Sequence, residues 1–67
     1  MQLTINGKIQ SFEEPGFSVM HLVTSLGLLG KRLAVECNGE IIPRSQFALT
    51  PLVDGDKLEI VGAVGGG

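Results

Sequence analysis

The residues of this chain best placed to do chemistry lie in its last segment, Gly62-Ala63-Val64-Gly65-Gly66-Gly67, which holds four of its ten glycines. A free α-carboxylate on Gly67 has a pKa of about 3.5, so it is ionised at neutral pH and is a poor electrophile until it is activated. A nucleoside triphosphate could activate it as an acyl-phosphate anhydride, which a sulfur, nitrogen or oxygen nucleophile then attacks. Because glycine has no Cβ, Gly65 and Gly66 would let a narrow channel of a partner enzyme close around bare backbone. The segment predicts an acyl group that a partner activates, with Gly67 as the reacting residue.

A glycine-rich end also has an ordinary interpretation, as a frayed terminus or a remnant of cloning. Glycine loses the most conformational freedom on ordering, so the segment 62–67 is expected to be flexible in isolation. Alternation of polar and apolar residues over 57–61 predicts a strand directly before it. Such a strand would hold the root of the tail in place and leave its tip free, which favours a presented group over a frayed end.

The elements that must position this tail are mostly strands. Period-two alternation predicts strands over 2–5, 8–12, 33–38, 40–42 and 57–61. Asn6-Gly7 and Asn38-Gly39 each join two of these runs, and Asn-Gly is the dipeptide that best tolerates positive φ at both centres of a type I′ turn. The sequence therefore predicts two β-hairpins.

One helix is predicted between the hairpins. Ser18 is a suitable N-cap, and Phe17 and Leu22 have the spacing of a hydrophobic staple across it. The residues at positions i, i+3, i+4 and i+7 form one apolar stripe: Val19, Leu22, Val23 and Leu26. Gly27 or Gly30 would end the helix in a left-handed conformation. A short amphipathic helix buries its stripe only against another layer, so we expect an α+β fold in which one helix packs across a mixed sheet of four or five strands.

The segment between the second hairpin and the last strand has weaker patterns. Residues 44–50 are predicted to be irregular or a single helical turn, with Phe47 and Leu49 pointing into the core. Asp54-Gly55-Asp56 is predicted to be a turn.

Two longer motifs give the chain a specific resemblance. Asn38-Gly39-Glu40-Ile41-Ile42-Pro43-Arg44, Asp54-Gly55-Asp56-Lys57-Leu58-Glu59-Ile60 and the terminal Gly66-Gly67 resemble the ThiS family, the sulfur carrier proteins of thiamine biosynthesis. The resemblance covers essentially the whole chain, and the length of 67 residues suits it. It implies a ubiquitin-like β-grasp domain over 1–61 followed by a flexible tail over 62–67.

The resemblance also implies a mechanism. In this family a ThiF-type adenylating enzyme uses ATP to convert the terminal glycine, here Gly67, into an acyl-adenylate. Sulfur from a cysteine-desulfurase persulfide relay then replaces AMP to give a thiocarboxylate, and the thiazole synthase ThiG takes that sulfur. Gly66 matches the penultimate glycine that passes through the partner's channel, whereas Gly65 is one glycine more than the family pattern requires. The chain would be a protein co-substrate and not an enzyme, with no cofactor of its own.

Other function classes remain open from the residues alone. The small subunit of molybdopterin synthase is a sulfur carrier of the same fold in another pathway. A TGS-type interaction module would have an incidental glycine end, and a protein modifier would be joined to lysines through Gly67. An independent enzyme comes last, because the sequence shows no nucleophile–base pair or metal-ligand set.

Composition narrows the partners. The net charge is −2, and the five Lys and Arg residues are scattered, so a nucleic-acid partner is not expected. A single cysteine fits a reducing compartment. The sequence shows no apolar segment of the roughly 20 residues that span a bilayer, and its start does not resemble a signal peptide. We expect a cytoplasmic protein that is monomeric when free.

A few other residues invite a chemical role. Cys37 is predicted to be a small buried hydrophobe beside Leu33 and Val35, and not a second sulfur site. His21 is predicted to face solvent on the flank of the helix, and the aspartates at 54 and 56 to form a turn and not a catalytic pair. Arg44 is expected either to contact a partner or to cap the following turn.

Overall fold

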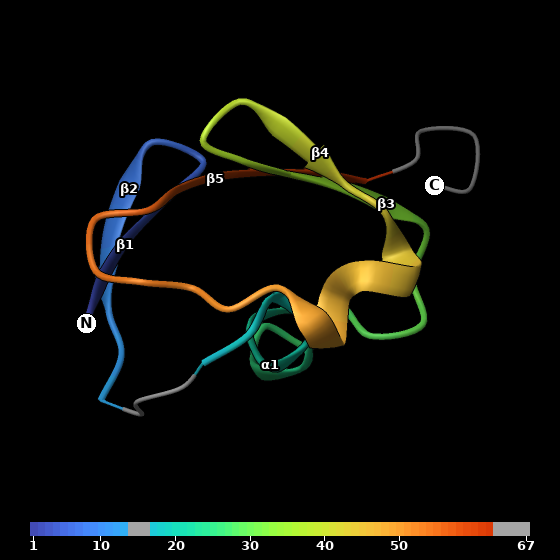
Figure 1. Cartoon of the computed structure of the whole chain (residues 1–67), viewed down its shortest axis with the longest axis horizontal. Helices are drawn as coiled ribbons and strands as arrows, with labels where there is room; N and C mark the ends of the chain where they lie inside the picture. The colour runs from blue at the N-terminus through green and yellow to red at the C-terminus, as the bar shows by residue number, and fades with distance from the viewer. Residues whose placement is uncertain (14–16, 63–67) are drawn as a thin grey trace.

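The computed structural model describes residues 1–13 and 17–62. Five strands form one sheet in the order β2-β1-β5-β3-β4, and helix α1 (Val19–Ser25) packs against one face of it (Figure 1). The strands are β1 (Gln2–Ile5), β2 (Lys8–Ser11), β3 (Leu33–Cys37), β4 (Glu40–Ile42) and β5 (Lys57–Gly62), and the 3₁₀ helix η1 (Arg44–Leu49) lies between β4 and β5 in the chain.

Strand β5 lies at the centre of the sheet. It runs parallel to β1 and antiparallel to β3, so the sheet is mixed. The expected α+β architecture, with one main helix on a mixed sheet, is thereby confirmed with five strands. Gly62 is paired with Leu33, one residue beyond the strand predicted from the sequence. Whatever follows β5 therefore starts from the middle of the sheet and not from its edge.

Both predicted hairpin turns are present. Asn6 and Gly7 have φ of 51° and 83°, and Asn38 and Gly39 have φ of 52° and 88°. Positive φ at both central residues is the requirement of a type I′ turn, whose twist matches that of the flanking strands. Each turn joins an antiparallel pair, β1 with β2 and β3 with β4.

Helix α1 begins at the predicted N-cap. The Ser18 hydroxyl accepts a hydrogen bond from the His21 backbone N–H at 3.2 Å, and His21 Nδ1 accepts one from the Ser18 backbone N–H at 3.2 Å. Together these bonds form a capping box in which histidine takes the place usually held by Glu or Gln. His21 is exposed, as predicted, but its role as a cap was not foreseen.

Gly27, and not Gly30, stops helix α1. Gly27 has φ of 73° and donates to the Thr24 carbonyl at 3.0 Å, while Leu28 donates to the Val23 carbonyl at 2.9 Å. These two bonds are those of a Schellman motif, with Gly27 in the left-handed position. Gly30 also has a positive φ, of 86°, but it lies farther along the following loop.

The core lies between the helix and the sheet. Its buried members are Leu3, Ile5, Phe17, Val19, Leu22, Val23, Val35, Phe47, Leu52 and Leu58. Three residues of the predicted helical stripe are buried and Leu26 is partly buried, so the stripe is confirmed. Full burial of each such side chain contributes about 1.5–3 kcal/mol.

The prediction for Leu49 is wrong. Phe47 enters the core at 3% exposure, but Leu49 is 72% exposed. A 3₁₀ helix has about three residues per turn, so a side chain two positions after a buried one points away from it. The sequence did not show that this turn is a 3₁₀ helix, and it therefore did not show on which face Leu49 lies.

Candidate functional site

The predicted site residues Gly65, Gly66 and Gly67 lie outside the described residues. The predicted division into a domain over 1–61 and a tail over 62–67 therefore stays a prediction. The structure describes the root of that tail, which is the carboxyl end of β5, and the surface around it. The geometry of the root decides what the chain can present to a partner.

The carboxyl end of β5 is held on both sides by different means. On one side β3 pairs with it in antiparallel register as far as Gly62, opposite Leu33. On the other side the parallel pairing with β1 stops at Leu58, opposite Ile5. Past that point the Asn6 side chain takes the place of the missing strand: its Oδ1 accepts from the Ile60 N–H at 2.8 Å, and its Nδ2 donates to the Ile60 carbonyl at 3.1 Å. Asn6 therefore extends the ladder toward the root of the tail.

The amino end of β5 is held by the other turn asparagine. Asn38 Oδ1 accepts from the Lys57 N–H at 3.0 Å, and the Asn38 N–H donates to the Lys57 carbonyl at 2.8 Å. The Asn38 amide also donates to Asp56 Oδ1 at 2.9 Å. Both Asn-Gly turns thus hold the same central strand, one at each end.

The two aspartates before β5 are structural, as predicted. Asp54 Oδ1 accepts a hydrogen bond from the Gln2 N–H at 2.6 Å, and Asp56 Oδ2 accepts one from the Val53 N–H at 2.9 Å. Carboxylates that accept from backbone N–H groups stabilise a turn. Their hydrogen bonds account for both residues without a catalytic role.

Cys37 lies on the inner side of β3 but is only half-buried, so the prediction of a buried side chain is confirmed in part. Burial raises the pKa of its thiol, and the carboxylates of Asp56 and Glu40 raise it further. A raised thiol pKa leaves little thiolate at neutral pH, and the thiolate is the reactive form. The side chain therefore has the environment of a packing residue and not of an activated sulfur.

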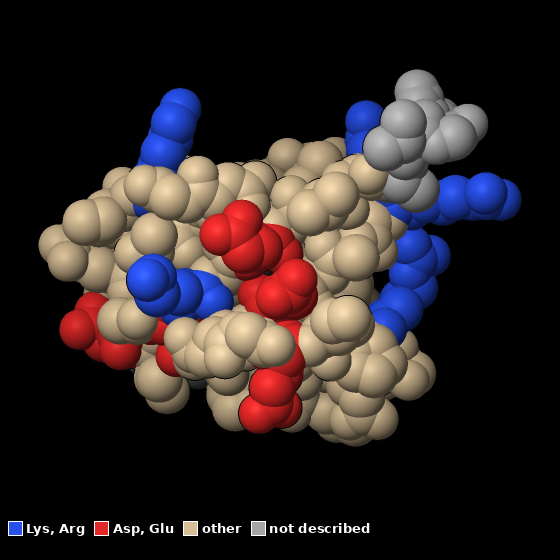
Figure 2. Space-filling view, turned by 90° about the horizontal axis from the view of Figure 1, so that it is seen from above, with Lys and Arg blue, Asp and Glu red and all other residues tan. Residues whose placement is uncertain are grey.

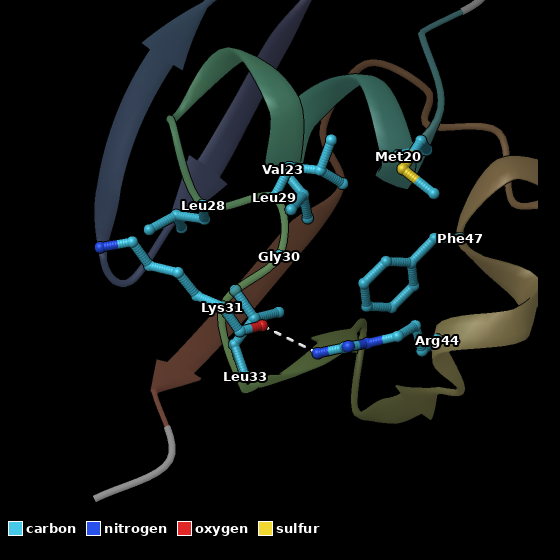
Figure 3. A pocket seen from close by; sticks show the side chains of 9 residues that line it. All are labelled: Met20, Val23, Leu28, Leu29, Gly30, Lys31, Leu33, Arg44 and Phe47. Atoms are coloured by element: carbon cyan, nitrogen blue, oxygen red, sulfur yellow. Dashed lines mark hydrogen bonds between the residues drawn. The ribbon is translucent and has the colours of Figure 1, made fainter. Parts of the chain in front are cut away.

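Arg44 has a structural bond that neither sequence-based alternative anticipated. Its Nη2 donates to the Lys31 carbonyl at 2.8 Å and so joins η1 to the loop that follows α1 (Figure 3). It does not cap η1, which has no side-chain cap at its start. Arg44 and Lys31 both line a hollow of about 240 Å³, whose other lining residues are mainly apolar side chains of α1, the loop and η1.

A metal site and a membrane-spanning helix are both absent from residues 1–13 and 17–62. These residues contain no group of three or more His, Cys, Asp or Glu side chains that could hold a metal ion. No helix among them is long and apolar enough to cross a membrane.

Known proteins resemble the chain over its whole length. The model of the ThiS family matches residues 3–67. The sulfur carrier protein ThiS of Bacillus subtilis is 37% identical over 65 residues, which cover 97% of this chain and 98% of that protein. The crystal structure of the thiamine biosynthesis protein ThiS from Geobacter metallireducens matches with a TM-score of 0.85 and 35% identity, covering both chains completely.

A larger relative has another name. A thiazole synthase of Paramagnetospirillum magneticum is 45% identical over 67 residues, which are all of this chain but 20% of that protein. The chain thus spans a fifth of the length of this relative. The family match and the full-length likeness to a solved ThiS structure agree with the fold described above, a mixed sheet carrying one helix. This chain belongs to the ThiS family of sulfur carriers, and its fold is the family's ubiquitin-like β-grasp.

Proposed function

We propose that this chain carries sulfur to the thiazole ring of thiamine on the carboxyl group of Gly67. A Gly67 carboxylate oxygen attacks the α-phosphate of ATP in a ThiF-type enzyme, and pyrophosphate leaves. The terminal sulfur of a persulfide, supplied by a cysteine-desulfurase relay, then attacks the acyl carbon and AMP leaves. A thiol cleaves the resulting sulfur–sulfur bond to release the thiocarboxylate. The thiazole synthase ThiG takes that sulfur into the thiazole precursor in exchange for an oxygen atom, which restores the carboxylate of Gly67.

The observation that carries this proposal is the match of the ThiS family model to residues 3–67, a range that includes all three terminal glycines. Within the described residues, the strand that leads to them is the central one, paired with β3 as far as Gly62 and bonded by the Asn6 side chain at Ile60. A fixed carboxyl end of β5 supports presentation of the tail, because it limits the range of positions from which the tail can enter a partner's channel. Gly66 and Gly65 would then lie inside that channel.

The described part of the chain supports the role of a co-substrate. Its two aspartates, its one histidine and its half-buried cysteine are engaged in turns, a cap and packing. Activation and transfer then belong to the partners, including the use of ATP. We place this exchange in the cytoplasm, where a reducing milieu preserves a thiocarboxylate.

The name of one relative favours thiazole as the sulfur acceptor. That relative is called a thiazole synthase, and one fifth of it is 45% identical to this chain. A carrier-like segment in such a protein supports ThiG over a molybdopterin-forming enzyme as the partner here.

The test is to load the protein with ATP, its adenylating enzyme and a labelled sulfur donor. The intact mass should rise by the difference between one sulfur and one oxygen atom, and the label should pass to thiazole when thiazole synthase is added. Deletion of Gly67, or addition of one alanine after it, should abolish loading without changing the circular dichroism spectrum. No mass change in the native chain would refute the sulfur-carrier role, and label passing only to a molybdopterin precursor would refute the thiamine pathway.

A further inference from the structure

The positive charge of this protein is concentrated near the root of the tail. Lys31, Arg32 and Arg44 are three of its five Lys and Arg residues, and they line two neighbouring hollows, one of which includes Gly62 at the end of β5. Figure 2 shows several basic side chains at the right end of the molecule, others toward the left, and acidic side chains down the middle and at the lower left. Glu36 and Glu59 are directly paired on adjacent strands of the sheet.

The two hollows lie on either side of the loop that joins α1 to β3. One has a volume of about 240 Å³ and is lined by residues of α1 and η1 (Figure 3), and the other, of about 230 Å³, is lined by Ile60 and Gly62 of β5. Leu28, Lys31 and Leu33 line both. The loop therefore borders two largely apolar depressions, of which the second reaches the root of the tail.

The loop itself combines an apolar contact with charge. Leu29 is 58% exposed, and Lys31 and Arg32 follow it two and three positions later in the sequence. We call Leu29, Lys31, Arg32 and Arg44 the basic loop surface. A protein interface combines apolar contacts with a polar rim, and Leu29 with the neighbouring cations offers both.

The basic loop surface is held in shape by hydrogen bonds. The Lys31 N–H donates to the Leu28 carbonyl at 3.1 Å, and the Lys31 carbonyl accepts from Arg44 Nη2 at 2.8 Å. The Schellman bond from Leu28 to Val23 anchors the other end of the loop on α1. A surface with its backbone already ordered loses less conformational entropy when a partner binds.

We propose that the basic loop surface docks on the adenylating enzyme, against an apolar side chain of that enzyme flanked by carboxylates. This inference rests on the proposed function. Gly62 lines the same hollow as Lys31 and Arg32, so an enzyme that admits the residues after Gly62 comes close to these two cations. Adenylation is the first such encounter between free proteins, and complementary charge acts chiefly on the rate of encounter. The net charge of −2 and the paired glutamates disfavour a nucleic-acid occupant.

The test compares two double charge reversals in the full chain. Lys31→Glu with Arg32→Glu changes the basic loop surface, and Lys8→Glu with Lys57→Glu makes the same change in net charge at exposed residues that line neither hollow. Pyrophosphate release by the adenylating enzyme is measured at several carrier and salt concentrations. We expect the first variant to lose about tenfold or more in kcat/KM with kcat at saturation unchanged, and the second to lose about twofold or less. The difference should shrink at high salt.

A second pair of variants tests the apolar contact. Leu29→Ser should raise KM, whereas Leu49→Ser, at a leucine that is 72% exposed, should not. Equal losses in the two charge-reversal variants would overturn the proposal, as would a loss seen only in sulfur delivery to thiazole synthase. If the native chain is not adenylated at all, the proposed function fails instead. Thermal unfolding of each variant separates a docking defect from a folding defect.

Discussion

The two Asn-Gly turns of this protein have the same dipeptide and nearly the same backbone, but they hold opposite ends of one strand. Asn38 bonds Lys57 where β5 begins, and Asn6 bonds Ile60 near where it ends. Each contact lies just past the end of a pairing, but the Asn38 backbone N–H also bonds Lys57, whereas at Ile60 only the side chain of Asn6 makes the bonds. Identical local sequences therefore do different work, and the turn at Asn6 is the one next to the candidate functional end.

The largest expected effect comes from removing the buried side chain of β5 that lies between the two asparagine contacts. Leu58 lies in β5 between the two asparagine contacts and is 1% exposed. Leu58→Ala should lower the free energy of unfolding by about 3 kcal/mol, because it leaves a cavity in the core. Leu49→Ala should change it by less than about 0.5 kcal/mol, because that leucine is exposed. Urea denaturation measures both, and similar values would contradict the core as assigned.

Asn38→Gly isolates the amide at the start of β5, since glycine keeps the positive φ. We expect a loss of about 1.5 kcal/mol, because the variant leaves the Lys57 N–H and one Asp56 oxygen without this partner. Hydrogen exchange should accelerate at Lys57, and sulfur loading of the folded protein should be unchanged. A loading defect at saturating partner would show that the start of β5 also matters for presentation.

Asn6→Gly makes the same change at the other end. The expected loss of stability is smaller, about 1 kcal/mol, because both bonds are exposed and lie near the end of the strand. Hydrogen exchange should accelerate at Ile60. Unlike Asn38→Gly, this variant should also lower kcat/KM for adenylation, because the root of the tail is less well held. If the two glycine variants load equally well, the functional difference between the turns does not exist.

The smallest expected effect concerns Cys37, close to the Asn38 turn. Its thiol pKa is raised from the ordinary value of 9.0, first by burial and then by Asp56 and Glu40. In the unfolded chain the thiol ionises at lower pH, so its contribution to stability is complete below the unfolded pKa and declines as pH rises above it. Cys37→Ala should therefore flatten the loss of stability that sets in as pH rises above 9.0. An unchanged pH profile would contradict the raised pKa.

Local chemistry made much of the fold predictable from the sequence. The positive φ of a type I′ turn is a requirement that Asn-Gly meets by itself, and both turns were located from that pair alone. The start of α1 followed from Ser18, and its end was narrowed to Gly27 or Gly30, of which the structure identifies Gly27. Each of these features depends on residues within a few positions of one another.

Features that depend on register were not predictable. Asn6 and Ile60 are 54 positions apart, so no local pattern shows that the turn side chain replaces a missing strand. Leu49 was misplaced because its direction depends on the 3₁₀ geometry of η1. The capping role of His21 was missed because histidine is uncommon at that position. The terminal glycines remain a prediction from sequence and family, since the structure describes the chain only as far as Gly62.

The central claim, that sulfur is carried on the carboxyl group of Gly67, can be tested directly against the one competing sulfur position. The loaded protein and its Cys37→Ser variant are compared by intact mass and by fragmentation of the carboxyl-terminal peptide. A thiocarboxylate exchanges oxygen for sulfur, whereas a persulfide on Cys37 adds a whole sulfur atom. We expect an exchange of oxygen for sulfur on Gly67, and we expect it in Cys37→Ser as well. An added sulfur that disappears in that variant would contradict it.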